Sequence, residues 1–320
     1  MLGRALSCLT REMASEGMRT LLVCFNRGLA DHLREQCNGI SQLDVATFHQ
    51  VCHHWIARAK ADLHRDFLAE AKRDHPRADE FNQLMPLALA NAIDALGPAY
   101  DAIVVDEGQD FGDEFWMPIE MLLMSLEQGI FYVFLDENQD IYRRSAQIPV
   151  RSEPMVLDRN CRNTGPIHEA AYRHYRGAPV KASGIDGAAV EAIHANGIAR
   201  QVQSIVTLVS KLIAQEGITA HNISVLICDG REKGHFERLL ASSPLPKTAK
   251  LGRLEDYGTN VLTVDTVARF KGLERDVVIL CGFDGCSAEQ DRETLYVGMS
   301  GAKALLYLCG SPEAIERLTP

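Results

Sequence analysis

Asp101-Ala-Ile-Val-Val-Asp106-Glu107-Gly-Gln109-Asp110 is an apolar run that ends abruptly in two carboxylates. Such a run is typical of a buried parallel strand, which delivers polar groups to a site at its C-terminal edge. There the first carboxylate can hold Mg²⁺ through water, and the second can orient or deprotonate a water beside a bound phosphate. A strand followed by a solvated acidic turn gives the same pattern, because a bare acidic pair is a weak motif. The choice therefore depends on other parts of the chain.

Short apolar runs alternate with amphipathic stretches along almost the whole sequence. This alternation predicts an α/β fold in which parallel sheets are flanked by helices. The clearest helix covers residues 198–215, where apolar residues recur at helical spacing and Gly217 ends the pattern. The predicted strands are residues 20–25, 43–47, 102–105, 130–135, 190–193, 223–228, 261–264, 276–281 and 304–309.

The chain of 320 residues is long enough for two domains, each with its own core. Serines and prolines interrupt the pattern near residues 145–155, so we predict a first domain at residues 1–148 and a second at 149–320. Residues 56–98 are rich in charges of both signs and carry no strand signal. This segment is predicted to be a helical insertion in the first domain.

Composition excludes several classes of protein. No run approaches the roughly 20 apolar residues that span a bilayer, and the N-terminus carries charges where a signal peptide is apolar, so we expect a cytoplasmic protein with no membrane contact. The nine cysteines form no C-x-x-C pair, and the cluster His49-Gln-Val-Cys52-His53-His54 has no second ligand pair, which argues against structural zinc. Because the net charge is −10, nucleic acid would have to bind in a local groove.

Further segments turn the acidic pair into a specific signal. They are Cys24-Phe25-Asn26-Arg27, Ala46-Thr47-Phe48-His49, Phe134-Leu-Asp136-Glu-Asn-Gln139-Asp-Ile-Tyr142-Arg, Leu157-Asp-Arg-Asn160-Cys161-Arg162-Asn163-Thr164, Thr263-Val-Asp-Thr266-Val-Ala268-Arg-Phe-Lys271-Gly272-Leu273-Glu274 and Leu295-Tyr296-Val297-Gly298-Met299-Ser300-Gly301-Ala302. In order and spacing they resemble the motor core of the UvrD/Rep-type superfamily 1 DNA helicases over nearly the whole chain. Only about 100 residues separate Arg162 from Thr263, so the chain resembles a compact member.

The resemblance implies two RecA-like domains that clamp ATP in their cleft and pull on single-stranded or partly duplex DNA. Asp106 would be the metal ligand for Mg²⁺, and Glu107 would position the hydrolytic water. Gln109 and Gln139 would sense the terminal phosphate, while Arg162 from the opposite domain would stabilise the charge that develops on it.

The resemblance also assigns binding residues. Glu274, after the Lys271-Gly272 turn, would accept a hydrogen bond from the ribose of ATP. The residues that would contact DNA are Phe25, Asn26, Thr47, Phe48, His49 and Thr266. An aromatic face such as Phe25 or Phe48 can stack on a base, but both rings can equally be core residues at strand ends. Arg162 can equally form a surface salt bridge.

The chain departs from the family pattern in several places. It contains no G-x-x-x-x-G-K-[ST] loop for the phosphates, and residues 1–17 resemble the helix that follows that loop, so we expect the loop and its strand to have been removed. Gly301 stands where the final motif carries an arginine, and nearby Lys303 lacks the planar guanidinium fork. Cys161 replaces the tyrosine that stacks on adenine, and Ala268 replaces a histidine.

Three functional hypotheses follow. The first is an ATP-dependent DNA helicase or translocase, represented by a fragment without its phosphate loop and therefore inactive as an ATPase by itself. The second is a non-catalytic relative that binds single-stranded DNA or a partner protein, motivated by the three independent departures at Gly301, Cys161 and Ala268. The third is a metal-dependent nuclease that uses Asp106, Glu107 and Asp110.

Overall fold

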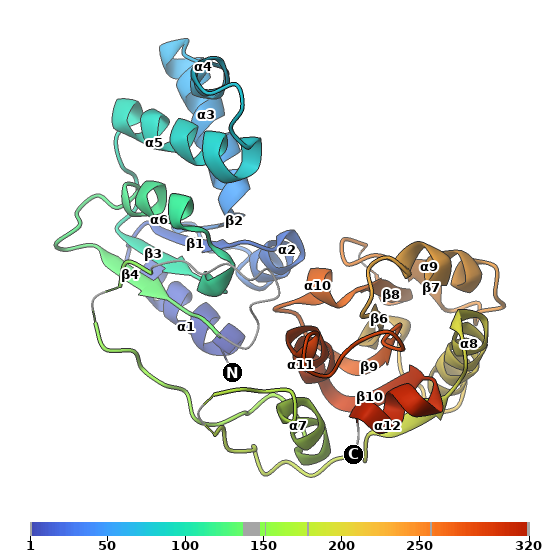
Figure 1. The fold of residues 1–320 in the computed structure, drawn as a ribbon. Helices are drawn as coiled ribbons and strands as arrows, with labels where there is room; N and C mark the ends of the chain where they lie inside the picture. Colours follow the sequence, from blue (N-terminus) through green and yellow to red (C-terminus); the bar gives the residue numbers. More distant parts are fainter. Residues whose placement is uncertain (1, 137–147, 151, 178, 257, 319–320) are drawn as a thin grey trace. The chain divides into compact units, whose positions relative to one another are not determined.

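Two parallel sheets, each flanked by helices, organise the chain in the computed structural model (Figure 1). The structure describes residues 2–136, 148–150, 152–177, 179–256 and 258–318. The α/β class with parallel sheets predicted from the sequence is confirmed. The chain divides into two units, Met1–Pro154 and Met155–Pro320, close to the boundary expected at residues 148/149.

The sheet of the first unit has four strands in the order β2 (Leu43–Thr47), β1 (Thr20–Cys24), β3 (Ala102–Val105) and β4 (Ile130–Val133). All neighbours are parallel. The two central strands, β1 and β3, are buried at every residue, which explains their uninterrupted apolar sequences. Because the strands are parallel, the residues that follow all four lie along one edge of the sheet.

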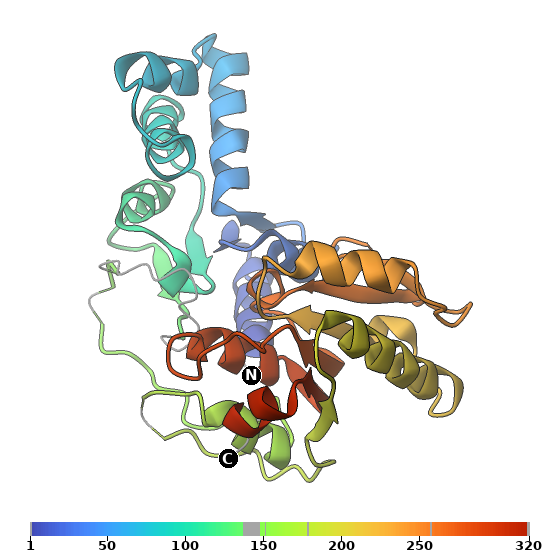
Figure 2. The same ribbon diagram turned by 45° about the vertical axis from the view of Figure 1, so that its right-hand side comes forward.

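Helices cover the first sheet. Helices α1 (Leu2–Ser15) and α2 (Arg27–Gln36) contact its strands. Alternate residues of the two central strands, Leu21 and Val23 of β1 and Ile103 and Val105 of β3, share a core with the remaining helices. Those are α3 (Phe48–Leu63), α4 (Phe67–Asp74), α5 (Met85–Leu96) and α6 (Asp113–Glu120), and the π-helical η1 (Glu80–Leu84) contacts α4, α5 and α6. Figure 2 shows α3 as a long helix with α4 and α5 beside it, so residues 56–98 are largely helical.

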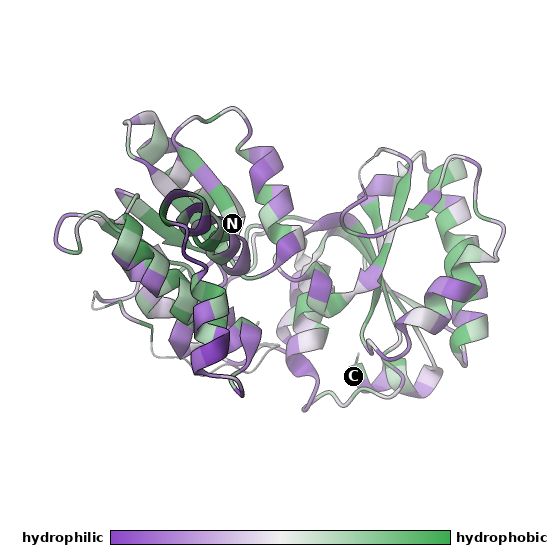
Figure 3. Cartoon of the chain, turned by 90° about the horizontal axis from the view of Figure 1, so that it is seen from above, coloured by the Kyte–Doolittle hydropathy of each residue, from purple (hydrophilic) through white to green (hydrophobic). Residues whose placement is uncertain are grey.

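The sheet of the second unit has six parallel strands. Their order is β5 (Glu191–His194), β10 (Ala302–Gly310), β9 (Arg275–Cys281), β6 (Ile223–Ile227), β8 (Val261–Thr266) and β7 (Lys250–Gly252). Alternate residues of β6 and β9, such as Val225 and Ile279, share one core with helices α8 (Ile198–Ala214) and α9 (Lys233–Ala241). In Figure 3 the strands of both units are mostly coloured as hydrophobic, whereas the helices also carry hydrophilic residues.

The remaining helices of the second unit contact other parts of the same sheet. Helices α7 (Gly165–Tyr172), α11 (Arg292–Ser300) and α12 (Pro312–Leu318) contact β10, and α11 also contacts β9. The short helix α10 (Val267–Phe270) directly follows β8, and two single 3-10 turns, η2 (Gly108–Asp110) and η4 (Ala220–Asn222), complete the elements used below. Within the described residues, no helix combines the length and the apolar character needed to cross a membrane.

One strand of the second sheet, β7, was not predicted from the sequence. The sequence analysis predicted no strand between residues 228 and 261, but Lys250–Gly252 pairs with β8 as an edge strand. It has three residues and none of them is buried, so it lacks the apolar run that identified the other strands. All nine predicted strands are present; two have the predicted ends, and the ends of the others differ by one or two residues.

Candidate functional site

The acidic turn after β3 is built by local hydrogen bonds. Asp106 is buried, and its Oδ1 accepts a hydrogen bond of 3.0 Å from the backbone N–H of Glu107. Glu107 has φ 54° and ψ 47°, a left-handed conformation that is uncommon for residues other than glycine. Gly108 donates its N–H to the carbonyl of Phe134 at 2.8 Å, and a Cβ there would lie only 2.5 Å from Cγ1 of Val133. The turn therefore needs glycine in order to approach β4 closely.

Gln109 links the ends of two strands. Its Nε2 donates to Oε2 of Glu107 at 2.7 Å, and its Oε1 accepts the N–H of Asp136 at 3.0 Å. The structure thus brings together Asp106, Glu107 and Gln109, and adds Asp136 from the end of β4. The other predicted phosphate sensor, Gln139, lies outside the described residues.

The donor set at this edge fits magnesium better than zinc. Two adjacent carboxylates, Asp106 and Glu107, supply only oxygen ligands. Among the described residues, no group of three or more His, Cys, Asp and Glu side chains is placed to hold a metal ion. Magnesium commonly uses one or two carboxylates and takes its other ligands from water and substrate phosphates. The site therefore suits a metal that arrives with a phosphate ligand.

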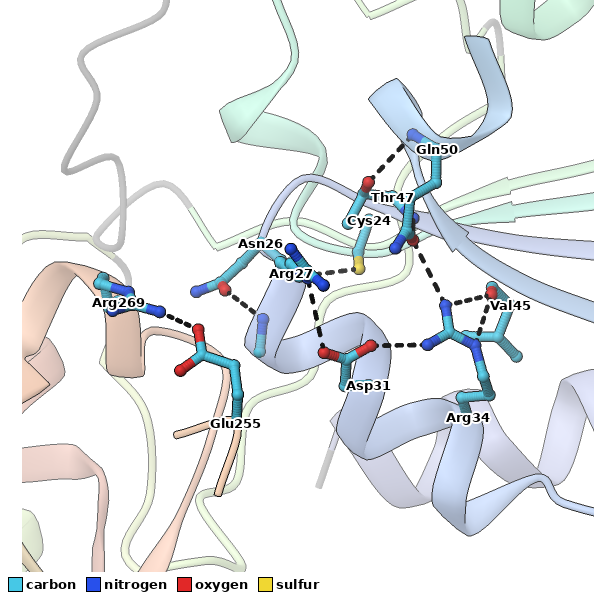
Figure 4. Close-up of polar contacts among 11 residues, drawn as sticks. Cys24, Asn26, Arg27, Asp31, Arg34, Val45, Thr47, Gln50, Glu255 and Arg269 are labelled. Carbon is cyan, nitrogen blue, oxygen red and sulfur yellow. Dashed lines mark hydrogen bonds and ion pairs between the residues drawn. The ribbon is translucent and has the colours of Figure 1, made fainter. Parts of the chain in front are cut away.

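Asn26 and Thr47, two of the predicted DNA contacts, cap helices at the same edge (Figure 4). The side chain of Asn26 accepts the N–H of Gly28 at 2.9 Å, at the start of α2. Thr47 forms a capping box with Gln50, in which each side chain accepts the backbone N–H of the other residue, at 3.2 and 2.9 Å. Both residues thus have a structural role that accounts for their identity without a ligand.

The packing of the first unit contradicts the prediction that Phe48 stacks on a base. Phe48 has no exposed surface, and its ring stacks on Phe115 with centroids 4.3 Å apart. A ring enclosed in this way offers no face to a base, because the start of α3 points it into the core. Phe25 is only partly buried, and its ring packs against that of Phe115 as well.

The exposed aromatic ring at this edge is one that the sequence analysis did not select. Phe81, in the π-helical turn η1, is 57% exposed. Nε2 of His49 lies 3.1 Å from the backbone carbonyl of Phe81, and the rings of Phe25 and His49 are in edge contact at 5.8 Å. The available signal was a phenylalanine among polar residues, Glu80-Phe81-Asn82, in a strongly charged helical segment. We call Phe25, His49 and Phe81 the aromatic edge.

Arg162 and Glu274, predicted to act separately, form an ion pair in the second unit. Nε of Arg162 lies 3.0 Å from Oε2 of Glu274, and the two side chains are 20% and 39% exposed. Gly272 has φ 80°, so the turn before Glu274 requires glycine. The neighbouring Lys271 is almost fully buried at 1% exposure, which leaves its ammonium little access to a ligand in solution.

Two buried asparagines hold the loop of Arg162 in place. Oδ1 of Asn160 accepts the N–H of Arg162 at 2.9 Å. Nδ2 of Asn163 donates to the backbone carbonyls of Ser300 and Ala302 at 2.8 and 2.6 Å. The amides also bond to each other, Asn160 Nδ2 to Asn163 Oδ1, at 2.7 Å. The sequence analysis assigned these residues no role, although their i, i+3 spacing around Arg162 was visible.

Gly301 lies between the two carbonyls that Asn163 holds, in a closely packed position. A Cβ at Gly301 would lie 2.8 Å from Cε1 of Phe270 and 3.3 Å from the carbonyl oxygen of Val297. The φ of Gly301 is −68°, so its backbone conformation is open to any residue. Phe270 has no exposed surface. A side chain at position 301, where the resemblance predicts an arginine, would therefore meet the ring of Phe270, and nearby Lys303 pairs with Asp276 at 2.7 Å.

Thr266 caps α10 and adjoins a buried charge cluster. Its Oγ1 accepts the N–H of Arg269 at 3.4 Å. The preceding Asp265 is completely buried, and its carboxylate pairs with Lys233 Nζ at 2.6 Å and with Arg269 Nη1 at 3.2 Å. Arg269 also pairs with Glu255 (Figure 4). A buried carboxylate with two cationic partners is expensive to disrupt, so this cluster fixes the end of β8.

Comparison with known proteins places helicase features in the second unit. Residues 262–309 match the family of UvrD-like helicase C-terminal domains, and this stretch runs from β8 to β10 through the ion pair partner Glu274 and Gly301. The match supports a relation to the helicase superfamily and, with it, a helicase-related function.

One of the solved structures that match this chain is similar to part of it. It is the C-terminal domain of a possible DNA helicase from Lactobacillus plantarum WCFS1, with 17% sequence identity and a TM-score of 0.38, and the similarity covers 49% of this chain and 93% of that one. No protein of curated function matches the chain.

Proposed function

We propose that this chain is part of a compact UvrD/Rep-type motor that uses ATP and Mg²⁺ to move on single-stranded or partly duplex DNA. The observation that carries the proposal is the match of residues 262–309 to UvrD-like helicase C-terminal domains. A parallel sheet with acids at its carboxyl edge, in the first unit, agrees with this function because such edges bind nucleotides in open α/β folds.

The first unit would provide the acid groups. Asp106 would hold Mg²⁺, which in this chemistry neutralises charge on the phosphates. Glu107 would accept a hydrogen bond from the attacking water, and Gln109 already fixes one oxygen of that carboxylate at 2.7 Å. Preset orientation matters, because positioning supplies most of the rate in phosphoryl transfer.

The second unit would provide a cation. Arg162 is held by Glu274 at 3.0 Å and by a loop that Asn160 caps. A guanidinium carries five donors, so it can keep this ion pair and still donate to a phosphate oxygen. Glu274 would then position Arg162 as well as accept a hydrogen bond from ribose, the role that the family resemblance gives it.

Single-stranded DNA would contact the carboxyl edge of the first sheet. The aromatic edge has one ring, Phe81, with more than half of its surface exposed, and stacking on such rings tolerates any base. Asn26, Thr47 and Thr266 would contact the sugar-phosphate backbone through groups at helix starts. Phe48 has no part in this proposal because of its burial.

Titration of a fluorescent ATP analogue tests the nucleotide proposal. The purified chain should bind the analogue in the presence of Mg²⁺, and Asp106→Asn should weaken binding by roughly 10-fold or more, because the metal loses a charged ligand. Asp94→Asn, at an exposed position on α5, is the matched control and should bind as the parent does. Equal binding by the parent and Asp106→Asn would refute the proposed role of the acidic turn.

A non-catalytic relative that binds single-stranded DNA is the second candidate. It is favoured by the packing of Phe270 against Gly301, and the 320 residues contain no Gly-Lys-Thr phosphate loop. Without a phosphate-loop lysine we expect this chain alone to hydrolyse ATP very slowly or not at all. Hydrolysis that single-stranded DNA stimulates, and that Glu107→Gln abolishes, would eliminate the second candidate. DNA binding without hydrolysis would favour it.

A further inference from the structure

A hollow of about 270 Å³ lies at the carboxyl edge of the second sheet. Strand β5 ends at His194 and its partner β10 ends at Gly310, and these two residues pair in the parallel register. Helix α8 follows β5 along the chain, and α12 follows β10. The hollow therefore lies where two neighbouring strands end and the helices that follow them begin.

The lining of the hollow supplies many hydrogen-bond donors. Its polar residues are His194, Asn196, Arg200, Gln203 and Ser204. None of the described residues that line it is acidic, although the chain as a whole has a net charge of −10. A guanidinium presents five N–H donors in a planar fork, and the amides, the hydroxyl and the imidazole can donate as well. Such a set matches an anion whose oxygens accept several hydrogen bonds.

Arg200 is the cation of this set, and it has no charged partner. Its side chain is exposed, and within the part of the chain that the structure describes it forms no ion pair and no hydrogen bond. Gln203 and Ser204 follow three and four residues later, so they lie on the same face of α8. The donors of the guanidinium are therefore available to a ligand in the hollow.

Hydrogen bonds fix the walls of the hollow. Gln201, in the first turn of α8, is buried, and its Nε2 donates to Oδ2 of Asp284 at 2.8 Å. Oδ1 of the same carboxylate accepts the N–H of Ser311, just before α12, at 2.9 Å. The N–H of Ala195 donates to the carbonyl of Gly310 at 2.7 Å. One carboxylate thus ties α8 to the start of α12, so the lining projects from a fixed frame, which lowers the ordering cost of binding.

We propose that this hollow binds a phosphate group, carried either by a nucleotide as a monoester or by a DNA strand as a diester. Arg200 donates two parallel hydrogen bonds to two phosphate oxygens, the arrangement that a guanidinium favours. His194 and Ser204 donate to the remaining oxygens. Because the volume of about 270 Å³ is below the usual range for drug-sized ligands, the hollow takes the phosphate and the adjoining sugar but leaves the base outside.

The hollow is separate from the groups assigned to the terminal phosphate of ATP. Glu274, the partner of Arg162, directly precedes β9, and Asn163 bonds to the carbonyl of Ala302, where β10 begins. Those groups therefore lie at the amino edge of the second sheet. The hollow lies at the opposite edge, beyond the nine residues of β10. Phosphate binding here consequently does not depend on the proposed motor function.

Calorimetric titration of the full chain tests the inference. Inorganic phosphate, thymidine monophosphate and a short deoxythymidine strand without terminal phosphates are each titrated in EDTA, so that binding through Mg²⁺ at the acidic turn does not contribute. Arg200→Gln should weaken the binding of the preferred ligand roughly 10-fold or more, because the charged fork is lost. Arg238→Gln removes the same charge from an exposed position on α9 and should bind as the parent does.

The three ligands distinguish the source of the phosphate. Weaker binding of inorganic phosphate and thymidine monophosphate by Arg200→Gln would identify a monoester, and weaker binding of the strand alone would identify a DNA diester. Two results would overturn the inference. One is no binding of any of the three ligands by the parent, and the other is an equal affinity of Arg200→Gln and Arg238→Gln for every ligand.

Chemical protection of the parent chain keeps the test valid should Arg200→Gln fail to fold. Phenylglyoxal modifies accessible guanidinium groups, and the modified residues are mapped by mass spectrometry. The ligand that binds should slow the modification of Arg200 and leave that of Arg238 unchanged, because both side chains are exposed in the free protein. An equal rate at Arg200 with and without the ligand would contradict the proposed site.

Discussion

Gly301 should tolerate no side chain while Phe270 keeps its position. In Gly301→Ala the new methyl group would lie 2.8 Å from Cε1 of Phe270, closer than carbon atoms pack, and the ring is enclosed on all sides. Overpacking of this kind costs about 1–3 kcal/mol. Replacing glycine by alanine also lowers the conformational entropy of the unfolded chain, which stabilises the folded state by about 0.4–1 kcal/mol, because the φ of −68° at this position suits alanine. We therefore expect a net loss of about 0.5–2 kcal/mol, and a greater loss for Gly301→Arg.

Urea unfolding followed by far-ultraviolet circular dichroism measures this loss. Gly285→Ala is the matched control, because a Cβ at Gly285 would meet no atom within 4 Å, so that variant should be neutral or slightly more stable. Both tryptophans, Trp55 and Trp116, are in the first unit, so their fluorescence reports whether that unit is unaffected. In a Phe270→Leu background the cost of Gly301→Ala should shrink, because the ring edge is gone. Gly301→Ala as stable as Gly285→Ala would refute the reasoning.

Three further predictions concern other parts of the structure. Asn163→Ala should destabilise the second unit by about 2–4 kcal/mol in urea unfolding, because two buried backbone carbonyls lose their donor. Burial lowers the pKa of both His168 and His174, so as the pH falls below about 6.5 the unfolded chain takes up protons before the folded chain does. The melting temperature should therefore fall between pH 7 and pH 5. This fall should be smaller in the variants His168→Gln and His174→Gln. His64→Gly should stabilise the first unit by about 0.5–1 kcal/mol in urea, because His64 has a left-handed backbone. Glu107→Gly should gain less than His64→Gly, because it also removes the acceptor of the Gln109 hydrogen bond, and it should weaken analogue binding, which His64→Gly should leave unchanged.

The sequence predicted the parallel sheets because their strands carry the signal within themselves. Residues 102–105 are apolar on both faces, and the strand made from them is buried at every residue. The acidic turn was predictable for the same reason, since a parallel strand must end at the edge where Asp106 lies. Lys250–Gly252 could not be found this way, because an edge strand that takes its hydrogen bonds from β8 needs no apolar run.

Contacts between distant residues account for what the sequence did not reveal. Phe48 and Phe25 both follow strands, have the same side chain and stack on Phe115 from a later helix, yet only Phe48, whose ring centroid lies 4.3 Å from that of Phe115 against 6.3 Å for Phe25, is fully enclosed. The pairing of Arg162 with Glu274 likewise joins residues more than a hundred positions apart. Local pattern specifies where a side chain leaves the backbone, but the neighbours that surround it come from the tertiary packing.

The departures from the helicase pattern differ in how strongly they are tied to the packing of the second unit. A phosphate-binding loop is a local element, so its absence from these 320 residues changes nothing in the packing of the second unit. Gly301 is different, because Asn163 fixes the carbonyls on both sides of it and Phe270 fills the space beside it. An arginine at position 301 would need Phe270 to be replaced by a smaller residue. A phosphate loop added elsewhere in the chain would not create that space beside residue 301. The case for a non-hydrolysing relative therefore depends on Phe270 and Gly301, and adding a Gly-Lys-Thr loop alone should strengthen nucleotide binding without restoring full turnover.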